Sequence, residues 1–335
     1  MNKKLPKGYI DRAPTLEDTE ALVEMFNAAS QKLLGIDQVT VEEQRIEFEV
    51  PGRSLEHDFR VVVAPDGTMA GYIEVFGLSE PFTPLYSWGR VHPRHEGQGV
   101  GSHLVEWAEA RARQALPLSA EELRVPMWVF CHTVDTQAQR LFTDHGFSLL
   151  RHNLRMVVEL DGPPPEPVLP AGITLRTIVP GQDEYPAFVA SREAFEDHFG
   201  HVKRPLEEEF QTWVYRDTNS SNYDPNLWFL AMDGEQIAGS SLCFKSTDND
   251  PQFGWVASLS VRRPWRKQGL GLALLQQSIG EFYRRGYRKV GLGVDAENLT
   301  GAVRLYEKAG MHSDAQHQMA IFEKELRPGK DPFTA

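Results

Sequence analysis

The residues with the clearest chemical potential form a short glycine-rich segment between a predicted strand and a predicted helix. Residues 255–261 are an apolar run that predicts a strand, and apolar residues recur at helical spacing after Gly269. Gly269 and Gly271 therefore stand where a helix begins and its first N–H groups have no partner within the helix. Glycines allow a phosphate to approach such N–H groups closely. The segment predicts an anion-binding site.

The neighbouring residues decide which phosphate ligand fits this segment. A Walker loop would continue as Gly-Lys-Ser/Thr, but Leu272 follows Gly271. A dinucleotide fingerprint would need a third glycine, and Leu274 occupies its place. The pattern that remains is Arg266-x-x-Gly269-x-Gly271. Alone, a pattern with so few fixed residues is a weak signal.

Two further elements make the signal specific. A second apolar strand is predicted at residues 289–294, and Asn298 and then Gly301-Ala302-Val303-Arg304-Leu305-Tyr306 follow it. Together with the glycine segment, this order of elements resembles the GNAT acetyltransferase superfamily, in which the glycine pattern forms the acyl-coenzyme A pyrophosphate loop. An ordinary strand–helix–strand unit would explain the glycines. It would not explain Arg266, Asn298 and Tyr306 together.

The resemblance implies an acyl-CoA-dependent N-acyltransferase that moves an acetyl group from acetyl-CoA to the primary amine of a small molecule. Tyr306 is the implied general acid for the departing thiolate. The implied acetyl-CoA contacts come from the first strand, the glycine loop and the asparagine: Leu259, Ser260, Val261, Arg266, Lys267, Gln268, Gly269, Leu270, Gly271, Leu272 and Asn298. A backbone N–H of the first three would stabilise the oxyanion. No metal is implied.

The general base is not evident in the sequence. Asp295 and Glu297 lie at the end of the second strand, where solvated carboxylates are also common. A helical stretch walls the acceptor site in this superfamily, and here it carries Glu196, Asp197 and His198. We expect these three to contact the substrate, with a solvated helix face as the alternative. Helix packing remains an alternative for Tyr306, as does a helix cap for Asn298.

The same pattern occurs twice. Residues 91–101 repeat residues 261–271 at a spacing of 170 positions, which indicates a duplicated domain. A proline-dense segment separates the copies. We expect an α/β protein of two tandem GNAT-like domains, each a mixed, mostly antiparallel sheet flanked by helices. The expected bounds are residues 1–160 for the first domain, 161–172 for the linker, 173–327 for the catalytic domain and 328–335 for a tail.

Each copy is expected to contain its own final strand. The first ends near Leu160, and residues 318–326 close the second. The first copy lacks three of the side chains that the chemistry would use: Glu96, Val134 and Phe142 stand where the second copy has Arg266, Asn298 and Tyr306. Glu96 would repel a pyrophosphate. We therefore expect the first copy to be non-catalytic, with a second coenzyme site as the alternative.

The composition excludes several classes of protein. The chain has 335 residues, is 41% hydrophobic and has a net charge of −12, so it lacks the basic balance of a nucleic-acid-binding protein. No stretch reaches the roughly 18 apolar residues of a membrane helix. Cys131 and Cys243 lack metal-site spacing and suit a reducing compartment. We expect a cytoplasmic monomer that acts as a pseudo-dimer, with a homodimer as the alternative.

Two other functions stay open. The tandem architecture also resembles mycothiol synthase, although those enzymes carry an acidic acceptor-binding residue where this chain has Gly254-Trp255. A non-catalytic acyl-CoA-binding sensor is the other alternative. The presence of Arg266, Asn298 and Tyr306 argues against a sensor, because a site without catalysis would be free to lose them.

Overall fold

The computed structural model describes residues 5–297 and 301–333. The chain folds into two compact units, each of which is built from separate segments of the sequence. Unit 1 contains described residues up to 152, residues 202–216 and residues 316–333. Unit 2 contains residues 153–201 and the described part of residues 217–315. The units therefore do not coincide with the two sequence copies.

The sheet of unit 1 is antiparallel except at one junction. Its strands, in spatial order, are β1 (Ile10–Arg12), β2 (Phe59–Val63), β3 (Met69–Phe76), β4 (Leu85–Val91), β5 (Val125–His132) and β13 (Met319–Arg327). Only β4 and β5 run parallel. Residues 65–67 lie in the turn of the hairpin that β2 and β3 form.

The sheet of unit 2 has the same plan. Its strands, in spatial order, are β7 (Ile173–Thr177), β8 (Tyr223–Asp233), β9 (Gln236–Phe244), β10 (Phe253–Val261), β11 (Lys289–Asp295) and β6 (Ser148–Glu159), with the short β12 (His312–Ser313) also paired to β6. Here β10 and β11 are the parallel pair. The tandem α/β architecture expected from the repeat is confirmed.

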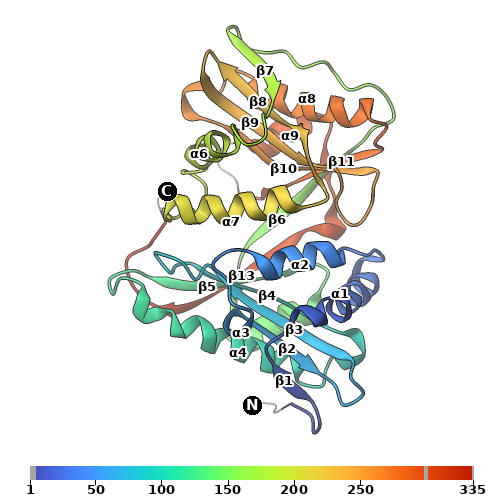
Figure 1. Ribbon diagram of the computed structural model, residues 1–335, viewed down its shortest axis with the longest axis vertical. Helices are drawn as coiled ribbons and strands as arrows, with labels where there is room; N and C mark the ends of the chain where they lie inside the picture. The colour runs from blue at the N-terminus through green and yellow to red at the C-terminus, as the bar shows by residue number, and fades with distance from the viewer. Residues whose placement is uncertain (1–4, 298–300, 334–335) are drawn as a thin grey trace. The chain divides into compact units, whose positions relative to one another are not determined.

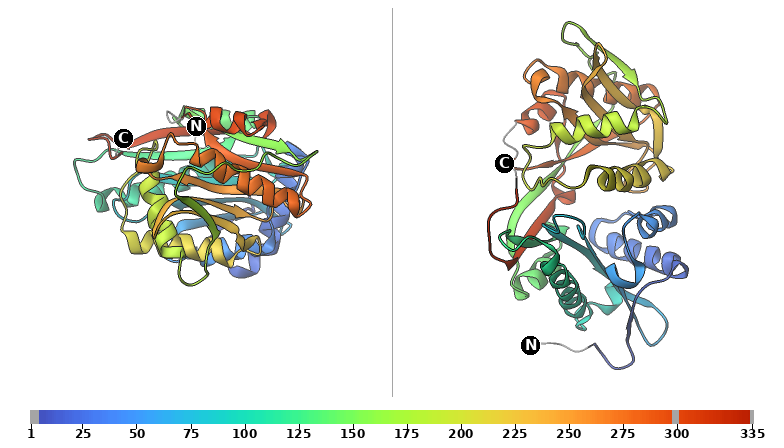
Figure 2. Two further views of the ribbon diagram at one scale, coloured as in Figure 1. Left: turned by 90° about the horizontal axis from the view of Figure 1, so that it is seen from above. Right: turned by 60° about the vertical axis from the view of Figure 1, so that its left-hand side comes forward.

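Helices cover both faces of the unit 1 sheet. The helices of this unit are α1 (Thr19–Leu34), α2 (Val41–Glu49), α3 (Leu55–Asp58), α4 (Val100–Gln114), α5 (Thr136–Asp144) and most of α7 (Leu206–Asn219). Apolar residues of α1 and α2 pack with Tyr72 in one core, whereas those of α4 pack with Ile73 in another. Adjacent residues of a strand point to opposite faces, so these helices lie on opposite faces of the sheet, as Figures 1 and 2 show.

The core of unit 2 lies between its sheet and α8 (Leu270–Arg284). Leu275, Ile279 and Phe282 of α8 pack with Val256 of β10 and with β11. The remaining helices of this unit are α6 (Glu184–Ala194), which packs on β9 and β10, and α9 (Ala302–Lys308), which contacts α8. An apolar stripe at helical spacing thus positions the glycine-started helix against the parallel strands.

The final strand of each copy pairs within the other unit, which corrects the expected closure. Residues 153–159 of β6 pair antiparallel with all of β11. β13 pairs antiparallel with β5, from Met319 opposite His132 to Arg327 opposite Val125. Both strands form close to the predicted positions. Their exchange was missed because hydrophobic alternation defines a strand but not the sheet edge that receives it.

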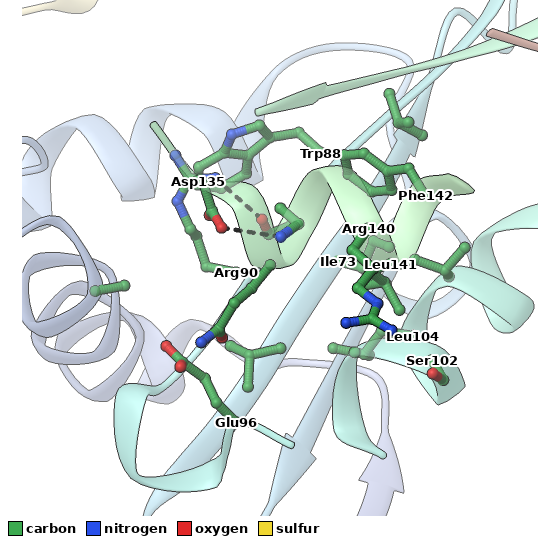
Figure 3. A pocket seen from close by; sticks show the side chains of 18 of the residues that line it. Ile73, Trp88, Arg90, Glu96, Ser102, Leu104, Asp135, Arg140, Leu141 and Phe142 are labelled. Atoms are coloured by element: carbon green, nitrogen blue, oxygen red, sulfur yellow. Dashed lines mark hydrogen bonds between the residues drawn. The ribbon is translucent and has the colours of Figure 1, made fainter. Parts of the chain in front are cut away.

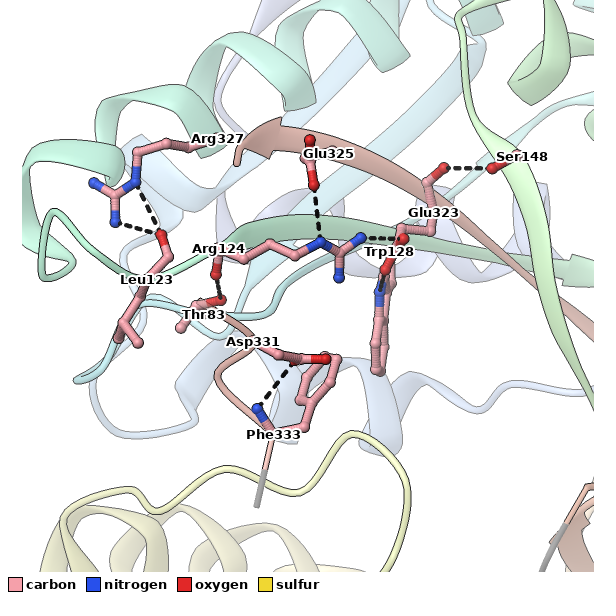
Figure 4. Close-up of polar contacts among 10 residues, drawn as sticks. All are labelled: Thr83, Leu123, Arg124, Trp128, Ser148, Glu323, Glu325, Arg327, Asp331 and Phe333. Atoms are coloured by element: carbon pink, nitrogen blue, oxygen red, sulfur yellow. Dashed lines mark hydrogen bonds and ion pairs between the residues drawn. The ribbon is translucent and has the colours of Figure 1, made fainter. Parts of the chain in front are cut away.

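Polar side chains fix the exchanged β13 in unit 1 (Figure 4). Arg124, just before β5, pairs with Glu323 and, at 2.9 Å, with Glu325. Glu323 also accepts a hydrogen bond of 2.9 Å from the indole Nε1 of Trp128. The Arg327 Nε donates to the carbonyl oxygen of Leu123 at 3.1 Å. These contacts give β13 a register that its backbone pairing alone would leave less tightly specified.

A helix from the second copy also belongs to unit 1. Arg204, just before α7, donates to the backbone of the loop between β3 and β4, including the carbonyl oxygen of Ser79 at 3.2 Å. At the other end of α7, Arg216 pairs with Glu47 at 3.1 Å, and the Tyr215 hydroxyl donates to Glu49 at 3.1 Å. Unit 1 thus takes two segments from the second half of the sequence.

Candidate functional site

The parallel strands of unit 2 separate before they end. β10 and β11 pair from Phe253 opposite Lys289 to Val256 opposite Leu292, and the remainder of both strands has no such pairing. A register shift between Val256 and Ser258 marks a bulge in β10 at this point. A bulge bends its strand and re-aims the following side chains. The result is an open fork between residues 257–261 of β10 and residues 293–295 of β11.

The glycine loop at the end of β10 leaves backbone N–H groups available. Gly269 caps α8 with φ 87° and ψ −4°, a left-handed conformation. The first helical hydrogen bond runs from Ala273 N–H to the Gly269 carbonyl oxygen, at 3.1 Å. The N–H groups of Leu270, Gly271 and Leu272 therefore lack helical acceptors. A Cβ on Gly269 would meet nothing within 4 Å, so the space beside this residue at the helix start is open.

Lys267 shares this unusual backbone. Its φ of 60° lies in the left-handed region, which costs a side-chain-bearing residue roughly 1 kcal/mol. Lys267 and Gln268 are both exposed. Two left-handed residues so close together turn successive N–H groups toward one side, a geometry that favours anions.

Gly271 has a different role from the one its place in the motif suggests. A Cβ there would lie 3.0 Å from Leu305 Cδ1 and 3.6 Å from Val261 Cγ2. The absence of a side chain thus permits α8 to approach α9 and the end of β10. Gly269 borders open space, whereas Gly271 serves packing.

Arg266 is tied to the protein rather than pointed at solvent. Its Nη2 donates to the carbonyl oxygen of Ala194 at 2.7 Å and to Asp197 Oδ1 at 3.1 Å, and its Nη1 also pairs with Asp197. Its Nε donates to the carbonyl oxygen of Val261 at 3.0 Å. The guanidinium lowers the pKa of the Asp197 carboxyl. Arg266 therefore joins the glycine loop to the segment after α6.

Tyr306 is buried in the core beside the fork. It is 8% exposed and packs in one cluster with Val256, Leu292 and Val294, which belong to the two diverging strands. Burial raises the pKa of Tyr306 to about 12. No described residue forms a hydrogen bond with its hydroxyl. At neutral pH the phenol therefore carries its proton and can donate it.

His198 lies in the segment that Arg266 holds. Its ring packs edge-on against Phe195, with centroids 4.7 Å apart. Neither ring nitrogen has a hydrogen-bond partner in the described chain. Burial lowers the pKa of His198, opposed by the charges of Asp197 and Asp295 and reinforced by that of Arg266. Since Asp295 ends β11 and Asp197 is tied to the end of β10, His198 lies within the electrostatic reach of both arms of the fork.

The other sequence-predicted residues are placed as follows. Leu259, Ser260 and Val261 form the end of β10, past the last pairing with β11. Glu196 lies beside Asp197 and is partly buried. Asn298 lies outside the described residues. The structure therefore brings the β10 end, the glycine loop and the segment 196–198 together.

The first copy contains an equivalent fork in unit 1. β4 and β5 pair only from Leu85 opposite Met127 to Ser87 opposite Val129. Gly99 caps α4 with φ 92° and ψ −4°, which nearly repeats Gly269. A cleft of about 910 Å³ opens here, lined by the strand ends, the glycine loop, α1, α4 and α5 (Figure 3). No register shift interrupts the pairing of β3 with β4, so this copy lacks the bulge.

The environment of Glu96 in this cleft differs from the expectation. Glu96 was expected to repel a pyrophosphate, but its carboxylate forms an ion pair with Lys32 of α1. The repulsion is therefore largely neutralised. Lys32 comes from a helix far away in sequence, and no local pattern around Glu96 indicated its partner.

Two other features were absent from the sequence reasoning. The Arg266–Asp197 pair was missed because each residue was assigned separately to a ligand. Arg90, which lines the unit 1 cleft with Trp88, was missed because only the motif positions of the two copies were compared. A residue-by-residue comparison would have set Arg90 against Ser260 and exposed the change of charge.

Comparison with known proteins gives a consistent result. The Acetyltransferase (GNAT) family profile matches residues 20–147 and again residues 190–311, together more than half of the chain. The chain is 30% identical over 304 residues to mycothiol acetyltransferase of Streptomyces coelicolor, covering 88% of this chain and 89% of that protein. It is 32% identical to the Thermobispora bispora mycothiol acetyltransferase over 238 residues, which cover 70% and 75% of the respective chains.

Solved structures show the same architecture over the full length. A GCN5-related N-acetyltransferase from Sphaerobacter thermophilus aligns with a TM-score of 0.78 and 38% identity, covering 99% of this chain and 100% of that one. A tandem GNAT protein from the clavulanic acid biosynthesis pathway aligns with a TM-score of 0.68 and 16% identity over 98% and 100% of the chains. The second similarity concerns the fold alone.

Two other features are absent from the part of the chain that the structure describes. Within residues 5–297 and 301–333, no helix combines the length and apolarity needed to span a bilayer. The same residues contain no group of three or more His, Cys, Asp or Glu side chains arranged to hold a metal ion.

Proposed function

Because the chain belongs to the acetyltransferase (GNAT) family and is an N-acetyltransferase, we propose that unit 2 transfers the acetyl group of acetyl-CoA to the primary amine of a small molecule. The observation that carries this proposal is the buried, protonated Tyr306 beside a fork whose end leads into a glycine loop with available N–H groups. A proton donor and an anion site then lie beside the same pair of diverging strands.

The glycine loop is the proposed pyrophosphate site. The N–H groups of residues 267–272 would donate to the phosphate oxygens, and the start of α8 would add its favourable dipole. Arg266 would act as a positioning residue, because its guanidinium is already bound by Asp197 and Ala194. Asn298, outside the described residues, remains a proposed coenzyme contact from the family resemblance.

The fork is the proposed site of the thioester. A backbone N–H among Leu259, Ser260 and Val261, on the edge of β10 that β11 leaves unpaired, would stabilise the oxyanion of the tetrahedral intermediate. When that intermediate collapses, the carbon–sulfur bond breaks. Tyr306 then donates its proton to the departing thiolate. A buried phenol gives up this proton only to a strong base formed beside it, and a desolvated thiolate is such a base.

His198 is the proposed general base. The attacking amine must lose a proton for the amide to form, and a neutral imidazole accepts one. Burial keeps His198 neutral near pH 7, while Asp197 and Asp295 would stabilise the imidazolium once it forms. Asp197 itself is held by Arg266, so we propose His198 and Glu196 for direct contact with the acceptor and Asp197 for holding their segment.

The acceptor is proposed to differ from that of mycothiol acetyltransferases, despite the identity of 30%. A side chain at position 254 would place its Cβ 2.4 Å from the ring of Phe282, so this strand start excludes an acidic residue there. Trp255 instead lies 5.3 Å from the guanidinium of Arg155, which pairs with Asp248. A mycothiol-acetyltransferase-like reaction is the second candidate, favoured by the length of the similarity.

Release of free coenzyme A from acetyl-CoA, measured across a panel of small amines, tests the proposal. We expect turnover with at least one amine and saturation in both substrates. The panel should contain the acceptor of mycothiol acetyltransferase, whose preferential use would establish the second candidate. Tight acetyl-CoA binding without turnover of any amine would instead indicate a non-catalytic sensor.

We also propose that the protein acts as a cytoplasmic monomer. Cys131 and Cys243 are free, buried thiols, which suit a reducing compartment. The duplication supplies two related units within one chain, so a second copy is not needed to form a pseudo-dimer. Light scattering at the protein concentration used in the activity assay would show whether a homodimer forms instead.

A further inference from the structure

The unit 1 cleft contains a positive charge where the proposed catalytic fork has a neutral side chain. Arg90 lies on β4 past its last pairing with β5 and lines the cleft. Trp88, two residues earlier, packs against Phe26 of α1 with ring centroids 5.2 Å apart. Residues two apart on a strand share a face, so Arg90 also points to the α1 side of the sheet. Figure 3 shows Arg90 and Trp88 among the side chains of the cleft.

Arg90 has no carboxylate partner within the described chain. Its guanidinium carbon lies 4.9 Å from the centre of the Trp88 ring, and its one hydrogen bond is a long contact of 3.4 Å to the Gly89 carbonyl oxygen. Burial lowers the pKa of Arg90, an effect that the charge of Asp135 opposes. A half-buried guanidinium that lines a cleft and has no carboxylate partner is available to bind an anion that enters the cleft.

Two of the three acidic residues of the cleft are engaged with other residues. Asp135 caps α5 by accepting the N–H of Ala138 at 2.9 Å, and no ion pair joins it to Arg90 within the described residues. Glu96 is paired with Lys32. Asp144 lines the cleft at the far end of α5. These carboxylates moderate the positive charge of Arg90 without satisfying its N–H groups.

The corresponding position in unit 2 shows the contrast. Ser260 is 3% exposed and its hydroxyl lies 2.9 Å from that of Ser240, so it is neutral and satisfied. Carboxylates, including Asp197 and Asp295, lie near that fork. Such a fork suits a cationic amine, whereas Arg90 would repel one and attract an anion.

We propose that the unit 1 cleft is a binding site for an organic carboxylate, which Arg90 binds through two parallel N–H···O hydrogen bonds. The planar guanidinium matches a carboxylate in this geometry, and its carbon lies 4.9 Å from the centre of the Trp88 ring, within the range of a cation–π contact. The shared chemistry is a carboxylate at the end of a short acyl chain. The ligand is either a free dicarboxylic acid or the coenzyme A thioester of such an acid, which keeps one free carboxylate. The thioester is included because the Gly97–Gly101 loop lines the same cleft.

Calorimetry on the full chain tests this site. The probes are succinate, its neutral analogue succinamide, and succinyl-CoA, the last measured in a Gly269→Val background to suppress the proposed unit 2 site. We expect one-to-one binding of succinate or succinyl-CoA to unit 1 and no comparable binding of succinamide. Binding of succinate alone would identify the free acid as the ligand, and binding of succinyl-CoA alone would identify the thioester.

Arg90→Met should weaken this binding about 10–100-fold, as expected when hydrogen bonds to a charged group are lost. The matched control is Arg94→Met, which removes the same charge from an exposed residue of the neighbouring loop. Arg90→Lys keeps the positive charge but cannot form two parallel hydrogen bonds to a carboxylate, so it should give an intermediate affinity. It also replaces Arg90→Met if that variant fails to fold.

Three outcomes would overturn the proposal: no binding of either carboxylate at millimolar concentration, equal binding of succinamide, or unchanged affinity in the Arg90 variants. The proposed acetyl transfer is tested separately. Arg90→Met should retain the acetyl-CoA turnover of the wild-type chain, since Arg90 belongs to the other fork. A failure of acetyl transfer in wild type would leave the carboxylate result unaffected.

Discussion

The two forks share a backbone and differ in chemistry. Gly99 and Gly269 cap their helices with nearly the same backbone angles. A Cβ added to Gly101 or to Gly271 would in each case lie 3.0 Å from a leucine of the following helix. The side chains around this frame have changed: a buried tyrosine in one fork, Phe142 and Arg90 in the other. The glycine loop is thus a requirement of the fold as well as of a ligand, and its presence alone does not establish catalysis.

The strands differ too. β10 is bulged where it leaves its partner, whereas β4 runs in regular register with β3. A bulge commonly occurs beside an active site because it turns backbone groups toward a ligand. The regular strand of unit 1 presents a side chain, Arg90, where the bulged strand of unit 2 offers its backbone. This difference leads us to expect catalysis in one fork and recognition in the other.

The largest effect should come from the phenol. Tyr306→Phe removes the proposed proton donor and should lower kcat about 10²–10⁴-fold, the usual cost of losing a general acid. Acetyl-CoA affinity, measured by calorimetry, should change little. The matched change Phe142→Tyr should leave turnover as it is. Full activity in Tyr306→Phe, or a gain in Phe142→Tyr, would break the proposed asymmetry.

His198 gives the next largest effect and a pH signature. His198→Gln should lower kcat/KM about 10²-fold at pH 7. Burial lowers the pKa of this imidazole below its ordinary value of 6.5, and the neutral form prevails at any pH above the lowered pKa. In the wild type, kcat/KM should therefore fall as pH drops through that value and level off above it. The variant should lose this acidic limb; an unchanged profile would assign the base elsewhere.

The glycine caps test which fork binds acetyl-CoA. Gly269→Val places a side chain in open space at the helix start and strains a backbone with φ 87°, so acetyl-CoA affinity should fall about tenfold or more. Gly99→Val is the matched change in unit 1, with φ 92°. It should spare acetyl transfer. Equal loss of turnover in both variants would mean that the forks are coupled or equivalent.

The smallest effect is expected from Arg266. Arg266→Met frees Asp197 and the segment that carries His198, so KM for the amine should rise a few-fold while acetyl-CoA affinity is nearly kept. The counterpart Glu96→Met should release Lys32 without altering acetyl transfer. A large, salt-sensitive loss of acetyl-CoA affinity in Arg266→Met would restore the direct phosphate contact that the sequence suggested.

The sequence was sufficient for most of the fold because local signals coincide with it. Spacing of apolar residues after Gly269 predicted α8, and apolar runs predicted β10 and β11. The repeat predicted two units of one plan. The expected helical placement of Glu196, Asp197 and His198 was wrong, because α6 ends at Ala194 and these three residues follow it.

Long-range choices were beyond sequence reasoning. The exchange of β6 and β13 depends on which sheet edge a strand meets, and both edges accept an alternating strand. The ion pairs of Asp197 with Arg266 and of Glu96 with Lys32 join residues separated by 69 and 64 positions. Such pairs depend on tertiary distance, which no local pattern encodes.

The exchanged strands also bear on how the chain is made. Synthesis runs from the N-terminus, so β5 leaves the ribosome long before β13, the strand that completes its sheet. Until then β5 offers an unpaired edge, and nascent β6 follows it closely as a competing partner. In the native fold β6 pairs with β11 instead, and the β5 edge stays without its own partner until β13 has been made. The early half of this protein therefore cannot finish folding during its own translation and waits for the late half.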